Sequence, residues 1–126
     1  GMTTSERVCR VLLVEDEPAA REGLSVILDI EPDLTLVGSA ASAEEALMLL
    51  HELAPDVVLL DNELAGSLTG VQAAPAFKEL APQAVVLLCT VTPEGELEAH
   101  PGVDGYLCKE DLVSLPDVVR QTRGKA

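Results

Sequence analysis

Residues 57–61 read Val-Val-Leu-Leu-Asp, and this stretch decides the fold. Four consecutive apolar residues bounded by turn residues are typical of a strand that is buried on both faces of a sheet. The run ends in Asp61. Open α/β sheets bind their ligands outside the carboxyl ends of the strands, so Asp61 is predicted to lie at the mouth of a crevice.

Four more apolar runs accompany this one and alternate with segments of helical periodicity. The five expected strands cover residues 8–14, 34–37, 57–61, 84–89 and 103–108. Such alternation indicates βαβ units with right-handed crossovers and a parallel sheet that is covered on both faces. We therefore predict an α/β, flavodoxin-like, doubly wound five-stranded parallel sheet with the strand order 2-1-3-4-5.

The first two helices have clear start signals. Pro18 opens the first as a first-turn proline, and Ser42 with Glu45 three residues later forms a capping-box pattern for the second. The third is less clear, because a proline inside a helix removes a hydrogen bond. Either the helix starts near Ala74 with Pro75 in its first turn, or it is bent at Pro75. We favour a long loop and a short third helix that ends near residue 80.

The last two helical segments are also marked by prolines and glycines. Residues 93–102 contain Gly95 and Pro101, which predicts a short or irregular fourth helix. The final helix is expected to start at Pro116 with Ser114 as a candidate cap, and the basic tail over residues 120–126 is expected to fray.

The length and charge of the chain limit the number of domains and the classes of function that it can have. The 126 residues suit one domain, residues 1–126, with Gly1 as a remnant of an expression tag. The net charge of −14 argues against direct nucleic-acid binding by this domain and against an anionic membrane surface. Neither a membrane span nor a signal peptide is evident in the sequence, and the three cysteines indicate a reducing cytoplasm.

Polar residues stand at the ends of four predicted strands. Glu15 and Asp16 follow the first, Asp61 ends the third, Thr90 follows the fourth and Lys109 follows the fifth. Parallel strands bring their carboxyl ends to one edge of the sheet, so these side chains should meet. Ionised carboxylates at this density need compensation, and hard oxygen ligands of this kind suit Mg²⁺.

This set of residues matches the needs of an acyl-phosphate intermediate. Asp61 would be the carboxylate nucleophile, a metal would hold the phosphoryl oxygens, and Lys109 and Thr90 would supply a cation and a hydrogen-bond donor. A single acid after a strand is usually just a solvated polar residue. Five such residues, each at a strand end, favour the functional interpretation.

The chain resembles a response-regulator receiver domain of two-component signalling. The resemblance runs from about Arg7 to Arg123 and is carried by VLLVEDEPAAREGL (11–24), DVVLLDNEL (56–64), VVLLCTVT (85–92) and GYLCKED (105–111). The sequences GYLCKED and REGL are similar to the subfamily whose members often carry a C-terminal helix-turn-helix DNA-binding domain. The resemblance leaves open whether such an output domain follows residue 126 or the receiver stands alone.

The resemblance implies roles for the strand-end residues. Asp61 would be the phosphoacceptor. Thr90 and Lys109 would contact the phosphoryl oxygens, and Tyr106 would act with Thr90 as the conformational switch. The Mg²⁺ ligands would be Asp16 directly, Glu15 mostly through metal-bound water, Asp61, and the backbone carbonyl of Glu63.

The resemblance also implies partners and an output surface. The phosphoryl donor would be a sensor histidine kinase or a phosphotransfer protein. The readout would be the face formed by residues 93–102, the fifth strand and the last helix, which could also form a homodimer. Such a domain is a signalling phosphoacceptor that catalyses only its own phosphorylation and dephosphorylation, and its output is usually transcription regulation.

Two alternatives stay open. A haloacid-dehalogenase-type phosphatase also uses a strand-end aspartate, but it needs a second aspartate where Glu63 stands, and the chain has no room for a cap domain. A phosphorylation-independent interaction module would have a degenerate site. The intact set of five strand-end residues argues against that module.

Overall fold

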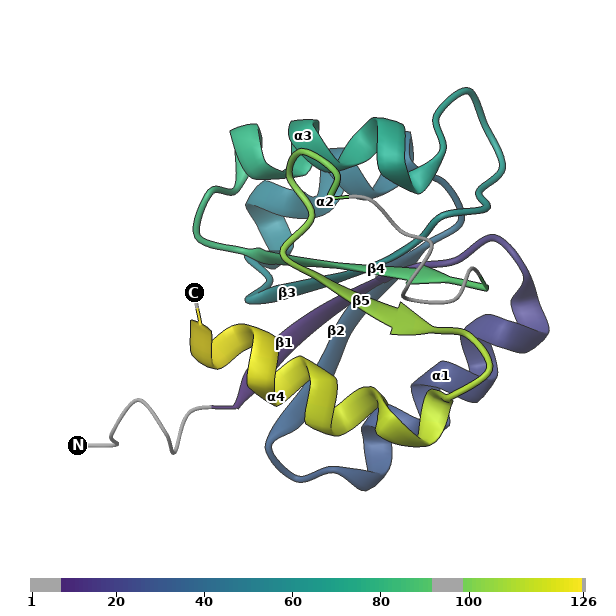
Figure 1. Cartoon of the computed structure of the whole chain (residues 1–126), viewed down its shortest axis with the longest axis vertical. Helices are drawn as coiled ribbons and strands as arrows, with labels where there is room; N and C mark the ends of the chain where they lie inside the picture. Colours follow the sequence, from purple (N-terminus) through teal and green to yellow (C-terminus); the bar gives the residue numbers. More distant parts are fainter. Residues whose placement is uncertain (1–7, 92–98, 126) are drawn as a thin grey trace.

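One sheet of five parallel strands forms the centre of the molecule, in the order β2-β1-β3-β4-β5 (Figure 1). The computed structural model describes residues 8–91 and 99–125. The predicted flavodoxin-like α/β fold and its strand order are confirmed. The strands are β1 (Cys9–Val14), β2 (Leu34–Ala40), β3 (Val57–Asp61), β4 (Val85–Thr90) and β5 (Gly105–Cys108).

Helices cover both faces of this sheet (Figure 1). α2 (Ala43–Leu53) and α3 (Gly70–Leu80) lie on one face, and α1 (Pro18–Ile30) and α4 (Leu115–Lys125) lie on the other. A short 3₁₀ helix, η3 (Leu112–Ser114), leads into α4. Because successive strand residues point to opposite faces, the core forms two layers, one on each side of the sheet.

The central strand β3 has the predicted bounds. It pairs with β1 on one side and β4 on the other, and all its residues are buried. The continuous apolar run follows from burial on both faces. Asp61 is 3% exposed, which makes it a buried carboxylate at the end of a rigid strand.

The predicted start of the third helix near Ala74 is wrong, because α3 begins at Gly70 and contains Pro75 in its interior. A capping box that the sequence reading overlooked starts this helix: Thr69 Oγ1 accepts from the Gln72 amide at 3.1 Å, and Gln72 Oε1 accepts from the Thr69 amide at 3.0 Å. These caps, together with the burial of Ala73, Ala74 and Phe77, outweigh the hydrogen bond that Pro75 removes.

The sequence predicts that residues 120–126 fray, but α4 continues through this tail and ends at Lys125. Arg120 explains the difference, because its guanidinium binds Glu31 and Asp33 at 2.8 Å in the turn before β2. Thr122 is buried as well. The helix begins at Leu115, one residue before the predicted start, and the Ser114 hydroxyl donates to Asp111.

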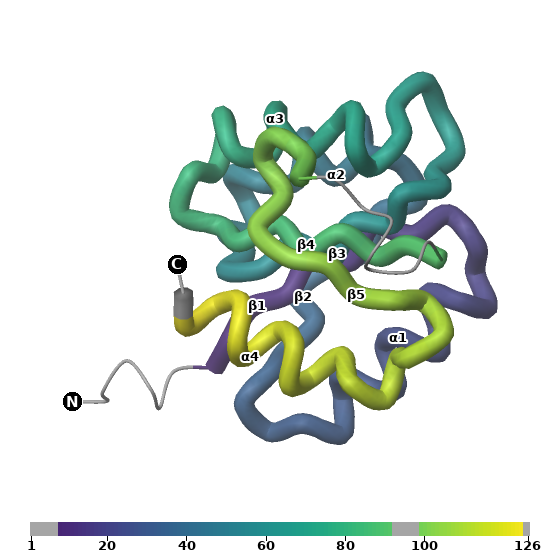
Figure 2. The backbone as a smooth tube through the Cα atoms, in the orientation of Figure 1, coloured from purple at the N-terminus to yellow at the C-terminus, as the bar shows by residue number. Residues whose placement is uncertain are grey.

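The segment before β5 packs on α3 (Figure 2). Gly102 has a φ of +83°, and a Cβ there would lie 2.8 Å from the Ala74 carbonyl, so only glycine fits. β5 starts at Gly105 rather than at residue 103. The reason is that the Val86 amide of β4 donates to the Asp104 carboxylate at 2.8 Å instead of to a backbone carbonyl of the neighbouring strand. The predicted short or irregular helix over 93–102 falls mostly on residues 92–98, outside the described residues.

Candidate metal centre

The carboxyl ends of β1, β3, β4 and β5 bring the predicted residues to one edge of the sheet. Glu15 and Asp16 follow β1, while Asp61 and Thr90 are the last residues of β3 and β4. The Lys109 amide donates to the Thr90 carbonyl at 2.9 Å, which fixes the end of β5 beside β4. Thr90 is itself buried. The expectation that these residues share one edge therefore agrees with the sheet topology.

Three of the acids form a compact cluster. One carboxylate oxygen from each of Glu15, Asp16 and Asp61 lies within 4.8 Å of the others. Glu15 and Asp61 are buried and Asp16 is half-buried. Oxygen ligands at this spacing suit a hard divalent cation such as Mg²⁺, which takes a few carboxylates and retains water.

Within this cluster, Glu15 has a raised pKa. Burial and a side-chain hydrogen bond to Asp61 raise the pKa of Glu15 to about 7. The Glu17 amide donates to Glu15 Oε2 at 3.1 Å and opposes this change. The raised pKa comes from burial beside another carboxylate, and a bound cation would offset both causes. Glu15 would then release its proton and bind the cation as a carboxylate, so the donor set fits Mg²⁺.

Lys109 supplies the positive charge of the site. Its Nζ lies 2.5 Å from Asp61 Oδ1. Burial by itself would lower the pKa of Lys109. The hydrogen bond to Asp61 and the charges of Asp61, Glu15 and Glu63 outweigh burial, so the pKa is raised and the ammonium stays charged.

The turn after β3 holds the Asp61 carboxylate in place. Asp61 Oδ1 accepts from the Glu63 amide at 3.0 Å, and Asn62 Oδ1 accepts from the Val71 amide at 3.2 Å. Gly70 packs so closely that a Cβ there would lie 2.4 Å from the Asp61 carbonyl oxygen. Glu63 is exposed, and the predicted role of its carbonyl as a metal ligand stays a prediction.

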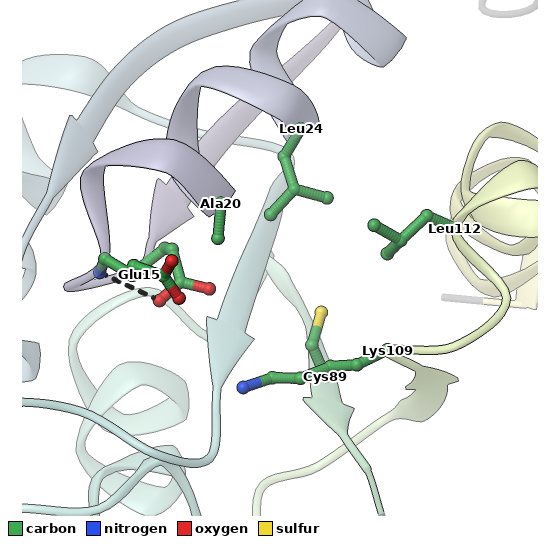
Figure 3. Close-up of a pocket in the computed structure, with 7 residues that line it drawn as sticks. Glu15, Ala20, Leu24, Cys89, Lys109 and Leu112 are labelled. Atoms are coloured by element: carbon green, nitrogen blue, oxygen red, sulfur yellow. Dashed lines mark hydrogen bonds between the residues drawn. The ribbon is translucent and has the colours of Figure 1, made fainter.

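A pocket of about 180 Å³ adjoins the acidic cluster (Figure 3). In Figure 3 the Lys109 amine extends toward Glu15, while the Cys89 sulfur points toward Leu112. Leu24 and Ala20 of α1 complete its apolar side. The pocket is thus lined by α1, by η3 and by the charged edge of the sheet.

Cys89 departs from expectation. Alternation along each strand predicts that Cys89 and Cys108 both point away from the site. Cys89 is instead paired with Asp61 on one side and Leu107 on the other, so it shares their face and Cys108 lies on the opposite one. Burial, followed by the charge of Asp61, raises the pKa of Cys89 to about 12, as expected for a buried apolar filler.

Tyr106 lies on the opposite face of the sheet, half-buried against the layer under α2 and α3. Its hydroxyl accepts from the His100 amide at 3.1 Å. The two rings meet edge to face with centroids 6.5 Å apart. The side chain proposed as a switch is therefore anchored to the segment that precedes β5.

The fold and this strand-end site together define a class of signalling domain. The sequence model of the response regulator receiver domain matches residues 11–120, so the chain belongs to that family. It is the receiver domain of a response regulator of two-component signalling.

Individual relatives agree with this assignment. The chain is 37% identical over 124 residues to the response regulator protein VraR of Staphylococcus aureus (strain NCTC 8325 / PS 47), covering 93% of this chain and 58% of VraR. The signal receiver domain of the putative response regulator NarL from Mycobacterium tuberculosis superposes with a TM-score of 0.81 at 27% identity, covering 95% of this chain and 99% of that one. A LuxR-family two-component response regulator from Aurantimonas sp. SI85-9A1 gives a TM-score of 0.81 at 27% identity, covering 94% and 86%.

The VraR sequences are longer than this chain, which spans about 58% of their length. Among residues 8–91 and 99–125, no helix combines the length and apolar character needed to cross a bilayer.

Proposed function

We propose that Asp61 accepts a phosphoryl group from a sensor histidine kinase or a phosphotransfer protein in a Mg²⁺-dependent reaction. One observation carries this proposal: a buried carboxylate at a strand end contacts a charged lysine and also belongs to a cluster of three acids. A nucleophilic carboxylate needs this combination, because negative charge builds up around it as the phosphoryl group arrives.

The transfer forms a bond between an Asp61 oxygen and phosphorus. It breaks the bond from phosphorus to the donor histidine nitrogen, which keeps the electron pair and takes up a proton. When bound by Glu15, Asp16, Asp61 and the Glu63 carbonyl, Mg²⁺ supplies charge neutralisation for the phosphoryl oxygens. Lys109 and the Thr90 hydroxyl would hold the remaining oxygens, and Glu15 would give up its proton as the cation binds.

The output would follow from the same residues. Thr90 turns toward the phosphoryl group, and Tyr106 then rearranges with the segment before β5. The surface of that segment, β5 and α4 becomes the readout and the homodimer face. In this proposal the chain is a signalling phosphoacceptor that catalyses only its own phosphorylation and dephosphorylation. It acts in the cytoplasm, and it neither binds nucleic acid directly nor enters a membrane.

The domain organisation is part of the proposal. Residues 1–126 form a single receiver domain. The S. aureus relatives extend well beyond the matched part, and a LuxR-family regulator is among the similar structures, which supports an output domain that regulates transcription after residue 126.

Acetyl phosphate and beryllofluoride test the phosphoacceptor role. In the presence of Mg²⁺ the chain should gain one acid-stable, base-labile phosphoryl group, visible by intact mass, and Asp61→Ala should lose it. Asp29→Ala is the matched control, because Asp29 is an exposed carboxylate on α1. Turnover of a small phosphate ester would support the phosphatase instead, and no Mg²⁺-dependent change with either reagent would support the phosphorylation-independent module.

A further inference from the structure

The loop that follows Asp61 is fastened to the first turn of α2 by one side chain, Glu44. Glu44 Oε2 accepts from the Ser67 hydroxyl at 2.9 Å and from the Ser67 amide at 3.1 Å. Two residues before Ser67 in the chain, Ala65 forms an isolated parallel β-bridge with Ser42, the N-cap of α2. The far part of the loop is therefore held at two neighbouring points by α2.

Gly66 lies against the same carboxylate. Its φ is +94°, and a Cβ there would stand 3.0 Å from Glu44 Oε2 and 3.1 Å from Oε1. Oε1 is shielded from solvent and has no hydrogen-bond partner within residues 8–91 and 99–125. Shielding a carboxylate oxygen in this way costs free energy, so the two Ser67 donors must offset it. These donors also hold the pKa of Glu44 below its ordinary value, which keeps the acceptor ionised.

The near part of the same loop belongs to the candidate metal centre. Asp61 Oδ1 accepts from the Glu63 amide at 3.0 Å. Glu63 is the residue whose carbonyl is the predicted fourth ligand. Three residues separate Glu63 from Ser67, so the main chain of residues 63–67 is fixed by Asp61 at one end and by Glu44 at the other.

We propose that Glu44 is a positioning residue for the metal centre. It fixes residues 65–67 and thereby holds the Glu63 carbonyl where it can bind Mg²⁺. This inference rests on the proposed function. The physical reason is preorganisation. Glu44 orders this exposed, glycine-containing loop when the protein folds, so the conformational entropy is lost at that stage. Cation binding then does not have to order the loop, and its affinity is not reduced by that entropy cost.

Calorimetric titration of the full chain with Mg²⁺ tests this role. Glu44→Ala should bind Mg²⁺ about tenfold more weakly, at the low end of the range for outer partners of metal ligands. Glu44→Gln should recover most of the affinity, because its amide oxygen can still accept from Ser67. Glu45→Ala is the matched control: it removes an acid from the same turn and the bond from the Ala41 amide, and it should change the affinity less than about twofold.

A second readout needs no metal. Amide hydrogen exchange at residues 63–67 of the Mg²⁺-free chain should speed up in Glu44→Ala and stay unchanged in Glu45→Ala. Ser67→Ala, an exposed change that keeps the backbone donor, should show a smaller effect of the same sign if Glu44→Ala does not fold.

The outcomes separate the two proposals. If the wild type binds Mg²⁺ and Glu44→Ala binds it equally well, the positioning role is overturned while the proposed function stands. If Glu45→Ala weakens binding as much as Glu44→Ala does, general weakening of α2 explains the effect, and the positioning role is again overturned. If the wild type binds no Mg²⁺, the proposed function fails and this inference fails with it.

Discussion

Lys109 Nζ lies 2.5 Å from Asp61 Oδ1. The contact passes over the end of β4, which lies between β3, where Asp61 is the last residue, and β5, which Lys109 follows. The Asp61 side chain is 4% exposed and that of Lys109 is 25% exposed, so solvent screens the pair weakly. The lysine therefore balances part of the negative charge of the acidic cluster before any cation binds, and it contacts a carboxylate that belongs to the predicted metal ligands.

Lys109→Gln should separate two effects of this contact. We expect phosphorylation of Asp61 by acetyl phosphate to slow about 10²–10³-fold, because a charged donor to the phosphoryl oxygens is lost. Mg²⁺ binding should become tighter, because a positive charge that competes for Asp61 is removed. Mass spectrometry follows the first effect and calorimetry the second. Lys78→Gln, at the Asp104 ion pair, is the control, and weaker Mg²⁺ binding in Lys109→Gln would contradict the argument.

The raised pKa of Glu15 predicts a specific pH dependence. The folded state binds this proton more tightly than the unfolded chain, so the contribution of Glu15 to stability without metal is present below pH 4.5 and is lost as pH rises toward about 7. Mg²⁺ binding displaces the proton, so its affinity should rise over the same window. Thermal unfolding with and without Mg²⁺ across this pH range measures both trends.

Glu15→Gln is the test of that assignment. The amide cannot titrate, so the variant should lose the pH dependence of its metal-free stability between pH 4.5 and about 7. Glu22→Gln, an exposed α1 carboxylate, should behave like the wild type. An unchanged profile in Glu15→Gln would assign the titration to another group.

The strand-end residues could be predicted from the sequence because each one follows an apolar run that burial forces into the sheet. Val57–Asp61 is the clearest case, since its bounds agree with β3. The start of α3 could not be placed in the same way. Pro75 is a strong local signal and masked a competing one: Thr69 with Gln72 three residues later fits the capping-box pattern, and the structure shows that this pattern sets the start of the helix.

The remaining differences come from tertiary contacts between segments far apart in the chain. The face of Cys89 depends on the register between β3, β4 and β5, and one residue of register reverses the side. The link from Glu44 to Ser67 joins residues 23 positions apart. Glu44 stands beside Glu45 of the predicted capping box, and no pattern in the sequence distinguishes it as a partner of the loop.

The thiols should differ in reactivity. Burial raises the pKa of Cys9 to about 11 and that of Cys89 to about 12, so neither presents a thiolate at neutral pH. Cys108 is only half-buried. Brief treatment of the native chain with iodoacetamide should therefore label Cys108 first, as read by peptide mass spectrometry. A Cys108→Ser variant should label slowly until it is unfolded, and rapid labelling of Cys89 in the native chain would show that the pocket opens to reagents.

Tyr106→Phe isolates the hydroxyl that holds the segment before β5. The ring stays in its layer of the core, while the His100 amide loses its acceptor at 3.1 Å. We expect a loss of about 1 kcal/mol in the free energy of unfolding by urea, and faster hydrogen exchange at the His100 amide. Mg²⁺ affinity should not change, because Tyr106 lies on the face opposite the acidic cluster. If the exchange rate at His100 matches that of the wild type, the hydroxyl does not anchor this segment, and any movement of Tyr106 on phosphorylation would act through the ring alone.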